Sequence, residues 1–278
     1  MEAKRTRRYF PGDDYTIMQM TYPEKYLRPL FLLLLATMLS ACATTAKRGE
    51  LPWSLAQQLV LVVTPDWNAT RGTLRSYARD GQSWRAEGAA VPVVIGRGGA
   101  AWGIGLHPPQ PGGPSKREGD GRSPAGVFAI GTTFGYAPAE SFAMPYRALD
   151  AEDYCVDVSG SPLYNRIVAV RDVGAAAVAG STEPMRRDLH ADGDNAYRIG
   201  FLVEHNPRGT AGAGSCIFVH LWKAYDAPTA GCTALAEPEL RALINWLQPK
   251  RHPVFVLLPA SEYRQLRDAW QLPDEAAP

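Results

Sequence analysis

The sequence is poor in cysteine and histidine and has almost no excess of charge of either sign. It holds four cysteines and five histidines in 278 residues, and 29 basic side chains against 28 acidic ones give a net charge of +1. Such a balance provides no electrostatic basis for a nucleic-acid partner, so we expect none. No two cysteines form a CxxC pair, and the histidines are scattered. We therefore expect neither a metal site nor a cofactor.

The chain also lacks a hydrophobic run long enough to cross a bilayer. Its longest, "LFLLLLATMLSA", is too short for that and follows Lys25 and Arg28. A basic stretch, a short apolar core and small residues indicate a secretory signal over residues 1–41, with an overlong start before Met18 or Met20. The run ends in "LSAC", Leu39 to Cys42, which resembles the bacterial lipoprotein box. The alternative is an ordinary signal peptide with a chance cysteine.

The lipobox resemblance implies that Cys42 is lipidated and becomes the first residue of the mature chain. A lipid anchor holds a domain at a membrane surface without spanning it. Ala43 stands where an aspartate would retain a lipoprotein at the inner membrane, so the resemblance implies the periplasmic face of the outer membrane. Residues 42–56 are expected to be a tether.

Glycine and proline are abundant, 26 and 23 residues, between many short apolar runs. This pattern is typical of strands and turns, and we predict a mainly β fold with peripheral helices. One domain is expected over residues 57–272, and we expect a monomer. The expected strands include a hairpin over 73–88 and runs at 198–206 and 216–222. Residues 108–125 have the composition of a loop, and helices are expected at 237–249 and 260–272.

Export to an oxidising compartment permits disulfides. With Cys42 assigned to lipid, Cys155, Cys216 and Cys232 remain, and the sequence allows any of three pairings. A Cys155–Cys216 bond would leave Cys232 free; the alternative leaves Cys155 and Cys216 as buried free thiols.

Cys232 and His220 form the one pattern that suggests catalysis. His220 lies in the apolar strand "IFVHLW", and the following segment can loop back to place Cys232 beside it. Histidine can accept a thiol proton, while Gly231 would let a substrate approach and expose backbone N–H groups of Gly231 and Cys232 to an oxyanion. A helix starting near residue 237 would favour the thiolate. The alternative is a buried cysteine near a core histidine.

"HLWKAYDAPTAGCTAL" resembles the active-site segment of the L,D-transpeptidase catalytic-domain (YkuD-like) family, in which a strand histidine precedes a Ser/Thr-x-Gly-Cys turn. "KREGDGRSPAGVFAIG", residues 116–131, resembles a second family motif, and "YCVDVSGSPLYNRIV" is similar to a divergent branch. The resemblance spans residues 90–258 and implies a β-sandwich domain. It departs from the family at Ala234, where an arginine is usual, at Leu221 after the histidine, and at Ala230 before Gly231.

The resemblance also suggests which side chains contact the substrate. Thr229 belongs to the cysteine turn, Asp120 and Arg122 to the second motif, and Tyr164, Asn165 and Arg166 are candidate wall residues. Arg166 is a candidate replacement for the absent arginine. Lys116 and Arg117 are expected at a solvated surface, His205 in a structural role, and Trp222 in the core or pocket wall.

The implied substrate is the stem peptide of peptidoglycan. Cys232 would attack the carbonyl of its diaminopimelate residue, expel the terminal D-alanine and form a thioester, with His220 as the base. An amine acceptor then gives L,D-transpeptidation, and water gives carboxypeptidase or hydrolase activity. The alternatives are a non-catalytic peptidoglycan-binding lipoprotein and a structural envelope protein.

Overall fold

The structure is a computed structural model and describes residues 51–274. The predicted signal peptide, Cys42 and the tether up to residue 50 lie outside these residues. Among the described residues strands make up 34% and helices 14%, so the mainly β prediction is confirmed. Within the described part, no helix is long and apolar enough to cross a membrane.

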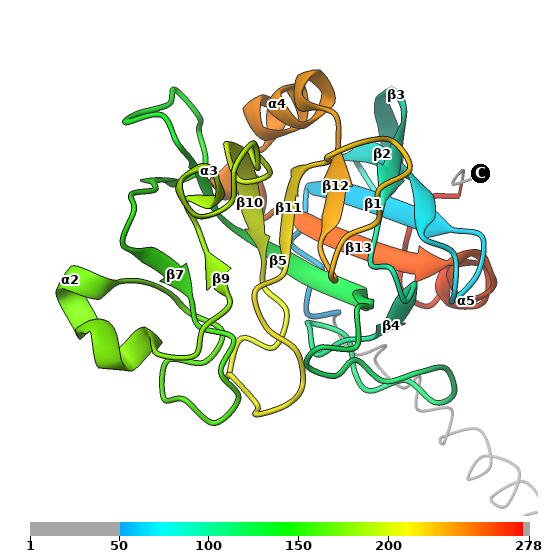
Figure 1. The fold of residues 1–278 in the computed structure, drawn as a ribbon. Helices are drawn as coiled ribbons and strands as arrows, with labels where there is room; N and C mark the ends of the chain where they lie inside the picture. The colour runs from blue at the N-terminus through cyan, green and yellow to red at the C-terminus, as the bar shows by residue number, and fades with distance from the viewer. Residues whose placement is uncertain (1–50, 275–278) are drawn as a thin grey trace, which may run out of the picture. The chain divides into compact units, whose positions relative to one another are not determined.

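Eight strands form a closed barrel (Figure 1). Their order around it is β10-β11-β12-β3-β2-β1-β13-β5, and β5 then pairs with β10. The predicted β-sandwich is not confirmed, because the long β5 bonds to β13 along one part and to β10 along the next. The bounds are β1 Gln58–Thr64, β2 Arg71–Asp80, β3 Ser83–Val94, β5 Ser123–Gly135, β10 Ile199–Val203, β11 Phe218–Leu221, β12 Thr233–Leu235 and β13 Val254–Pro259.

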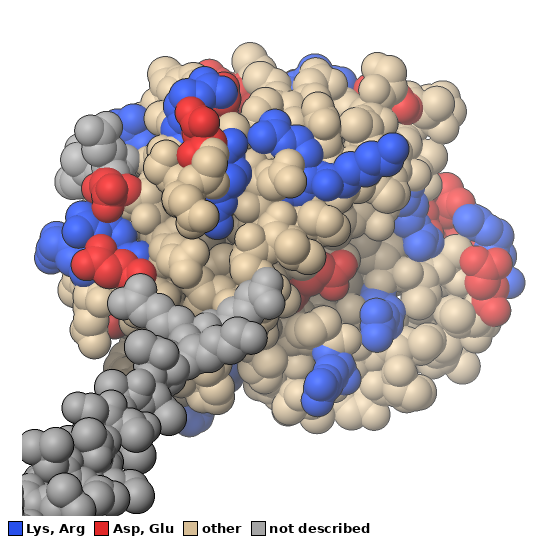
Figure 2. Space-filling model, turned by 180° about the vertical axis from the view of Figure 1, so that it is seen from behind, with Lys and Arg blue, Asp and Glu red and all other residues tan. Residues whose placement is uncertain are grey.

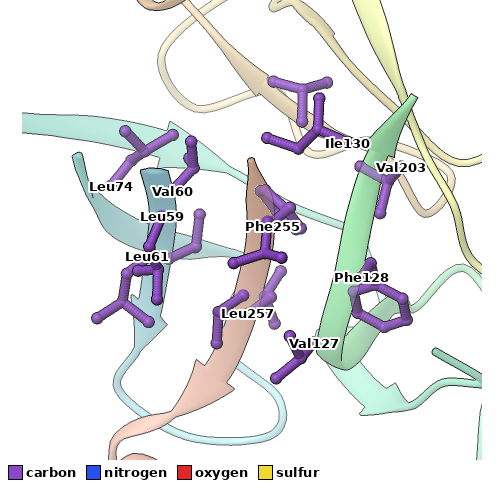
Figure 3. Close-up of a cluster of buried hydrophobic side chains, with 14 of the residues drawn as sticks. Leu59, Val60, Leu61, Leu74, Val127, Phe128, Ile130, Val203, Phe255 and Leu257 are labelled. Atoms are coloured by element: carbon purple, nitrogen blue, oxygen red, sulfur yellow. The ribbon is translucent and has the colours of Figure 1, made fainter. Parts of the chain in front are cut away.

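The barrel is filled by the apolar side chains of its central strands. β1 runs parallel to β13, and all residues of both strands are buried, as their unbroken apolar sequences indicate. In the register, Phe255 of β13 lies opposite Val60 of β1 on one side and Phe128 of β5 on the other; Figure 3 labels all three. Helix α5, Ala260–Leu266, packs against β1 and β13, while α4, Glu237–Trp246, packs against β10 and β11.

Several boundaries differ from the sequence predictions. The hairpin is present as β2 and β3, but β5 begins at Ser123, inside the segment predicted to be a loop over 108–125. Trp53, placed in the tether, is buried and donates its indole N–H to Trp270 O at 3.2 Å. The packed domain therefore starts before residue 57.

A small lobe stands beside the barrel, to the left of β10 and β11 in Figure 1. Its three-stranded sheet has the order β8-β7-β9. A disulfide joins Cys155 of β7 to Cys216, just before β11, and Cys232 is free. Of the pairings that the sequence left open, this is the one compatible with a cysteine nucleophile. The lobe elements are β7 Asp153–Cys155, β8 Ile167–Ala169, α2 Val170–Val173, a 3-10 helix Ala175–Val178, β9 Glu183–Pro184 and α3 Arg187–His190.

Three short elements complete the fold: β4 Ala100–Trp102 and β6 Tyr146–Ala148 pair with β5, and a 3-10 helix spans Pro249–Arg251. On the face opposite to that of Figure 1, basic and acidic side chains are interspersed among uncharged ones (Figure 2).

Truncation of Phe255 tests the barrel core. We expect Phe255→Ala to lower the free energy of unfolding by about 3–5 kcal/mol, because the cavity lies between strands that cannot move together. Leu189→Ala, at a position that is 58% exposed, should change it by less than about 0.5 kcal/mol. Chemical denaturation measures both values, and equal effects would contradict the assigned core.

Candidate active site

The predicted return of the chain beside His220 is present in the structure. β11 and β12 are parallel, with His220 opposite Ala234 and Val219 opposite Thr233. Cys232 directly precedes β12, and side chains two residues apart on a strand point to the same side of the sheet. Cys232 and His220 therefore lie on one face of adjacent strands. Ala234 lies directly beside His220; the active-site segment that this stretch resembles has an arginine at that position.

Both side chains line one pocket, of about 440 Å³. The barrel contributes the turn 228–232 and the segment after β11, and the lobe contributes Glu183 and Arg187. Because the lobe is tied to the barrel at Cys216, itself a lining residue, the disulfide fixes the two walls relative to each other. A pocket between two such walls is a common setting for a ligand site.

The tautomer of His220 is set by its own backbone. Its Nδ1 lies 2.8 Å from Leu221 O, and a carbonyl only accepts hydrogen bonds, so Nδ1 carries the proton and Nε2 is left as an acceptor. The Tyr197 ring packs edge-on against the imidazole, with centroids 5.1 Å apart. Burial lowers the pKa of His220 to about 4. The imidazole is therefore neutral and has the form required of a general base.

The Cys232 thiol is held in its neutral form. Its Sγ accepts a hydrogen bond from the Phe218 N–H at 3.3 Å and donates one to Cys216 O at 3.5 Å. Burial, reinforced by the charge of Glu183, raises the pKa of Cys232 to about 12. The expected thiolate, favoured by a cation or by the helix N-terminus, is thus not the form that this environment stabilises. In the described structure no hydrogen bond joins the thiol to His220.

The turn that carries Cys232 is fixed by hydroxyl groups. Cys232 O accepts hydrogen bonds from Ser123 Oγ at 3.1 Å and from Thr229 Oγ1 at 2.6 Å. The Gly231 N–H donates to Thr229 Oγ1 at 3.1 Å, so it is occupied and is not the free oxyanion donor that we predicted. The Cys232 N–H has no partner among the described residues. It is the remaining candidate oxyanion donor.

The lobe side of the pocket carries a charge network that the sequence did not suggest. Arg187 Nη1 lies 3.1 Å from Glu183 Oε1, and its Nη2 lies 2.7 Å from Asp194 Oδ2. Tyr197 donates its hydroxyl to Glu183 Oε1 at 2.8 Å. Burial raises the pKa of Glu183. Burial also opposes ionisation of Asp194, but hydrogen bonds from Arg187 and the Ala196 N–H outweigh it and lower that pKa to about 2.

Of the six predicted substrate residues, one lines the pocket and five do not. Thr229 is a lining residue. Asp120 instead organises its own loop, accepting hydrogen bonds from Lys116 Nζ at 2.6 Å and the Arg122 N–H at 2.9 Å. The Arg122 guanidinium donates to Trp67 O and Ala100 O at 3.1 and 2.9 Å. The Arg122 side chain therefore joins the loop at Trp67 to the start of β4 and does not line the pocket.

The other three predicted wall residues also act from outside the pocket. Tyr164 donates its hydroxyl to Glu118, which lines the pocket. Asn165 accepts a hydrogen bond from the Cys216 N–H at 2.8 Å. Arg166 donates to Pro207 O at 3.3 Å and is exposed, so it is not the replacement arginine beside His220 that we predicted. Arg187 is the arginine that the lobe places in the pocket.

Four further predictions concern neighbouring side chains. Lys116, expected at the surface, is buried, lines the pocket and pairs with Asp120, while Arg117 is exposed as expected. His205 is structural: it accepts from the Ile104 N–H at 3.2 Å and donates to Ala213 O at 3.0 Å. Trp222 lines the pocket.

Sequence reasoning missed Glu118, Glu183, Arg187 and Tyr197, which all line the pocket. The three lobe-side residues come from the segment 183–197, whose irregular sequence shows no periodicity, so no local signal marks them. No group of three or more His, Cys, Asp or Glu residues in the described part could hold a metal ion.

Comparison of the chain with protein-family models, with curated proteins and with solved structures finds no match.

The raised pKa of Cys232 predicts that the native thiol reacts slowly. At pH 8 we expect alkylation by iodoacetamide to be at least about 100-fold slower in the native protein than in urea, because the pKa near 12 leaves little thiolate. The native rate should still be rising above pH 10. Peptide mapping scores Cys232 separately from Cys42, and equal native and unfolded rates would contradict the assignment.

The lowered pKa of His220 predicts a loss of stability in acid. The unfolded imidazole titrates near 6.5 and the folded one near 4, so the unfolded state binds more protons between these values. The contribution of His220, at most about 3 kcal/mol, is complete above pH 6.5 and is lost as the pH falls towards 4. Urea denaturation from pH 7 to 4 should show a shallower decline for His220→Gln than for the wild type; identical declines would contradict the burial argument.

Proposed function

We propose that this chain is a cysteine-dependent acyltransferase that acts on peptidoglycan stem peptides as an L,D-transpeptidase. The observation that carries the proposal is the placement of Cys232 and His220 on one face of adjacent strands, in one pocket, with His220 Nε2 left as a proton acceptor. The resemblance of the two sequence motifs, which contribute the cysteine turn and the loop 116–122, supports the substrate class.

The reaction starts from neutral groups. As Cys232 Sγ attacks the carbonyl carbon of the diaminopimelate residue, its proton passes to His220 Nε2. The carbonyl oxygen becomes an oxyanion that accepts a hydrogen bond from the Cys232 N–H. Cleavage of the C–N bond then expels D-alanine, whose amine takes the proton from His220, and leaves a thioester on Cys232. An acceptor amine or water attacks the thioester and regenerates the thiol.

Proton transfer during attack suits the electrostatics of the pocket. A preformed thiolate–imidazolium pair would place two charges in a buried site, where desolvation opposes both. Substrate entry must also bring His220 and the thiol into hydrogen-bonding contact, since the thiol otherwise bonds to Cys216 O. In the proposed reaction the thiol therefore turns away from that carbonyl and towards His220 Nε2.

The proposal extends to location and assembly. With the predicted signal peptide and Cys42 lipidated, the domain would be a monomer anchored in the periplasm, at the outer membrane, where peptidoglycan is accessible. The L,D-transpeptidase-like domain would then be residues 57–272, extended at its start by the packed residues around Trp53.

The catalytic proposal is tested with disaccharide-tetrapeptide muropeptides. We expect the wild type to release D-alanine and Cys232→Ala to release none, while His220→Gln loses at least about 100-fold in rate, since it removes the general base. His190→Gln, at an exposed histidine, is the matched control and should keep full activity. Product profiles that are identical in the wild type and Cys232→Ala would refute the proposal.

Mass spectrometry of wild-type products with and without an added amine acceptor separates the outcomes. Cross-linked product with the acceptor indicates a transpeptidase, and trimmed peptide under both conditions indicates a carboxypeptidase.

A second candidate is a non-catalytic peptidoglycan-binding protein. The observations that favour it are the buried, neutral thiol and Ala234 in place of the arginine. It predicts that the wild type and Cys232→Ala bind the muropeptide equally and that neither turns it over.

A further inference from the structure

Arg97 lies on a glycine-rich loop whose path is fixed by close backbone contacts. The loop Gly96-Arg97-Gly98-Gly99 follows β3, and a Cβ at Gly96 would lie 2.3 Å from Gly121 O. A Cβ at Gly99, where φ is +82°, would lie 2.1 Å from Trp67 O. No side chain fits at either position, so the glycines are required for the loop to pack in this way.

The same loop is joined to the turn that carries Cys232. The Arg97 N–H donates to Thr229 O at 2.8 Å, and the Thr229 N–H donates to Ile95 O at 2.9 Å. Thr229 in turn donates its hydroxyl to Cys232 O at 2.6 Å. A short series of hydrogen bonds therefore fixes the backbone of Arg97 relative to the thiol.

The Arg97 side chain packs along Gly121 and lines the pocket. A Cβ on Gly121, where φ is +68°, would come within 3.0–3.3 Å of Arg97 Cγ, Nε and Cζ. The absence of a side chain at Gly121 thus makes room for the guanidinium, which would otherwise be displaced. The Arg97 side chain is exposed, and its contact with Gly121 favours one direction for it.

Among the lining cations of the described chain, Arg97 is the one without an acidic partner. Lys116 pairs with Asp120, Arg187 pairs with Glu183 and Asp194, and Lys223 pairs with Asp194. No ion pair is formed by Arg97 with any described residue. A positioned guanidinium that is not neutralised by the protein is suited to a carboxylate, which it can bind through two parallel hydrogen bonds.

We propose that Arg97 binds a free carboxylate of the acyl donor and so selects donors that carry one. This inference rests on the proposed function. The carboxylate is either the C-terminal one of the leaving residue or a side-chain one of the donor peptide, and the recognition chemistry is the same for both. Arg97 would be a specificity-determining residue, while Cys232 and His220 perform the chemistry.

The test uses three donors: the tetrapeptide muropeptide, its C-terminal carboxamide, and the form amidated at the diaminopimelate side-chain carboxylate. For the wild type we expect one of the amidated donors to show a KM raised by about 10- to 100-fold, since a charge-assisted hydrogen-bond pair is lost. In Arg97→Gln, the KM for the unmodified donor should rise by the same factor. The unmodified donor and that amidated donor should then have equal KM values. The amidated donor whose KM is raised in the wild type identifies the carboxylate that Arg97 binds.

Two variants serve as controls. Arg97→Lys keeps the charge without the two-pronged geometry and should retain part of the discrimination. Arg208→Gln removes an exposed arginine outside the pocket and should behave as the wild type. Thermal unfolding of Arg97→Gln, expected to be unchanged, excludes a folding defect. Discrimination that persists in Arg97→Gln overturns the proposal.

A failure of the proposed function is distinguished by binding. If the wild type turns over no donor, calorimetry with Cys232→Ala measures affinity for the same three donors. An affinity that falls with Arg97→Gln, and with one amidation, supports the Arg97 proposal without catalysis. An affinity that is independent of Arg97, or no binding at all, overturns it.

Discussion

The parallel pairing of β11 with β12 is the contact on which the site depends. It places Cys232 on the same side of the sheet as His220, although eleven residues, 222–232, separate the two strands in the sequence. β12 has three residues, and on its other edge it pairs with β3 through Ala234 and Val94 alone. So short a strand gains much of its fixed position from the hydroxyl groups of Ser123 and Thr229, which both bond to Cys232 O.

Burial then determines the protonation state of the two groups. Desolvation lowers the pKa of His220 and raises that of Cys232, so both are neutral at physiological pH. For the proposed acyl transfer this means that the neutral Cys232 thiol reacts slowly with other electrophiles. It becomes reactive when a bound substrate brings it into hydrogen-bonding contact with His220. The same environment accounts for both the predicted slow alkylation and the proposed coupling of proton transfer to attack.

The lobe converts an open face of the barrel into a pocket. Its sheet has three strands of two or three residues each, and the Cys155–Cys216 disulfide ties it to the segment that leads into β11. The lobe contributes Glu183 and Arg187, which form an ion pair, whereas Arg97 on the barrel side has no acidic partner among the described residues. This asymmetry between the two walls is what makes the barrel side the place where we expect a substrate carboxylate.

The sequence by itself determined the local features. Alternating apolar residues marked the hairpin and β11, Pro238 and the leucine spacing marked α4, and the apolar strand followed by a glycine turn marked His220 and Cys232. Only the tertiary structure decided that the strands close into a barrel, that Cys155 pairs with Cys216, and that Arg122 turns away from the pocket while Arg97 and Arg187 line it. The reason is physical: periodicity and turn chemistry act between neighbours in the chain, whereas barrel closure, disulfide choice and the direction of a long side chain depend on contacts between residues far apart in sequence.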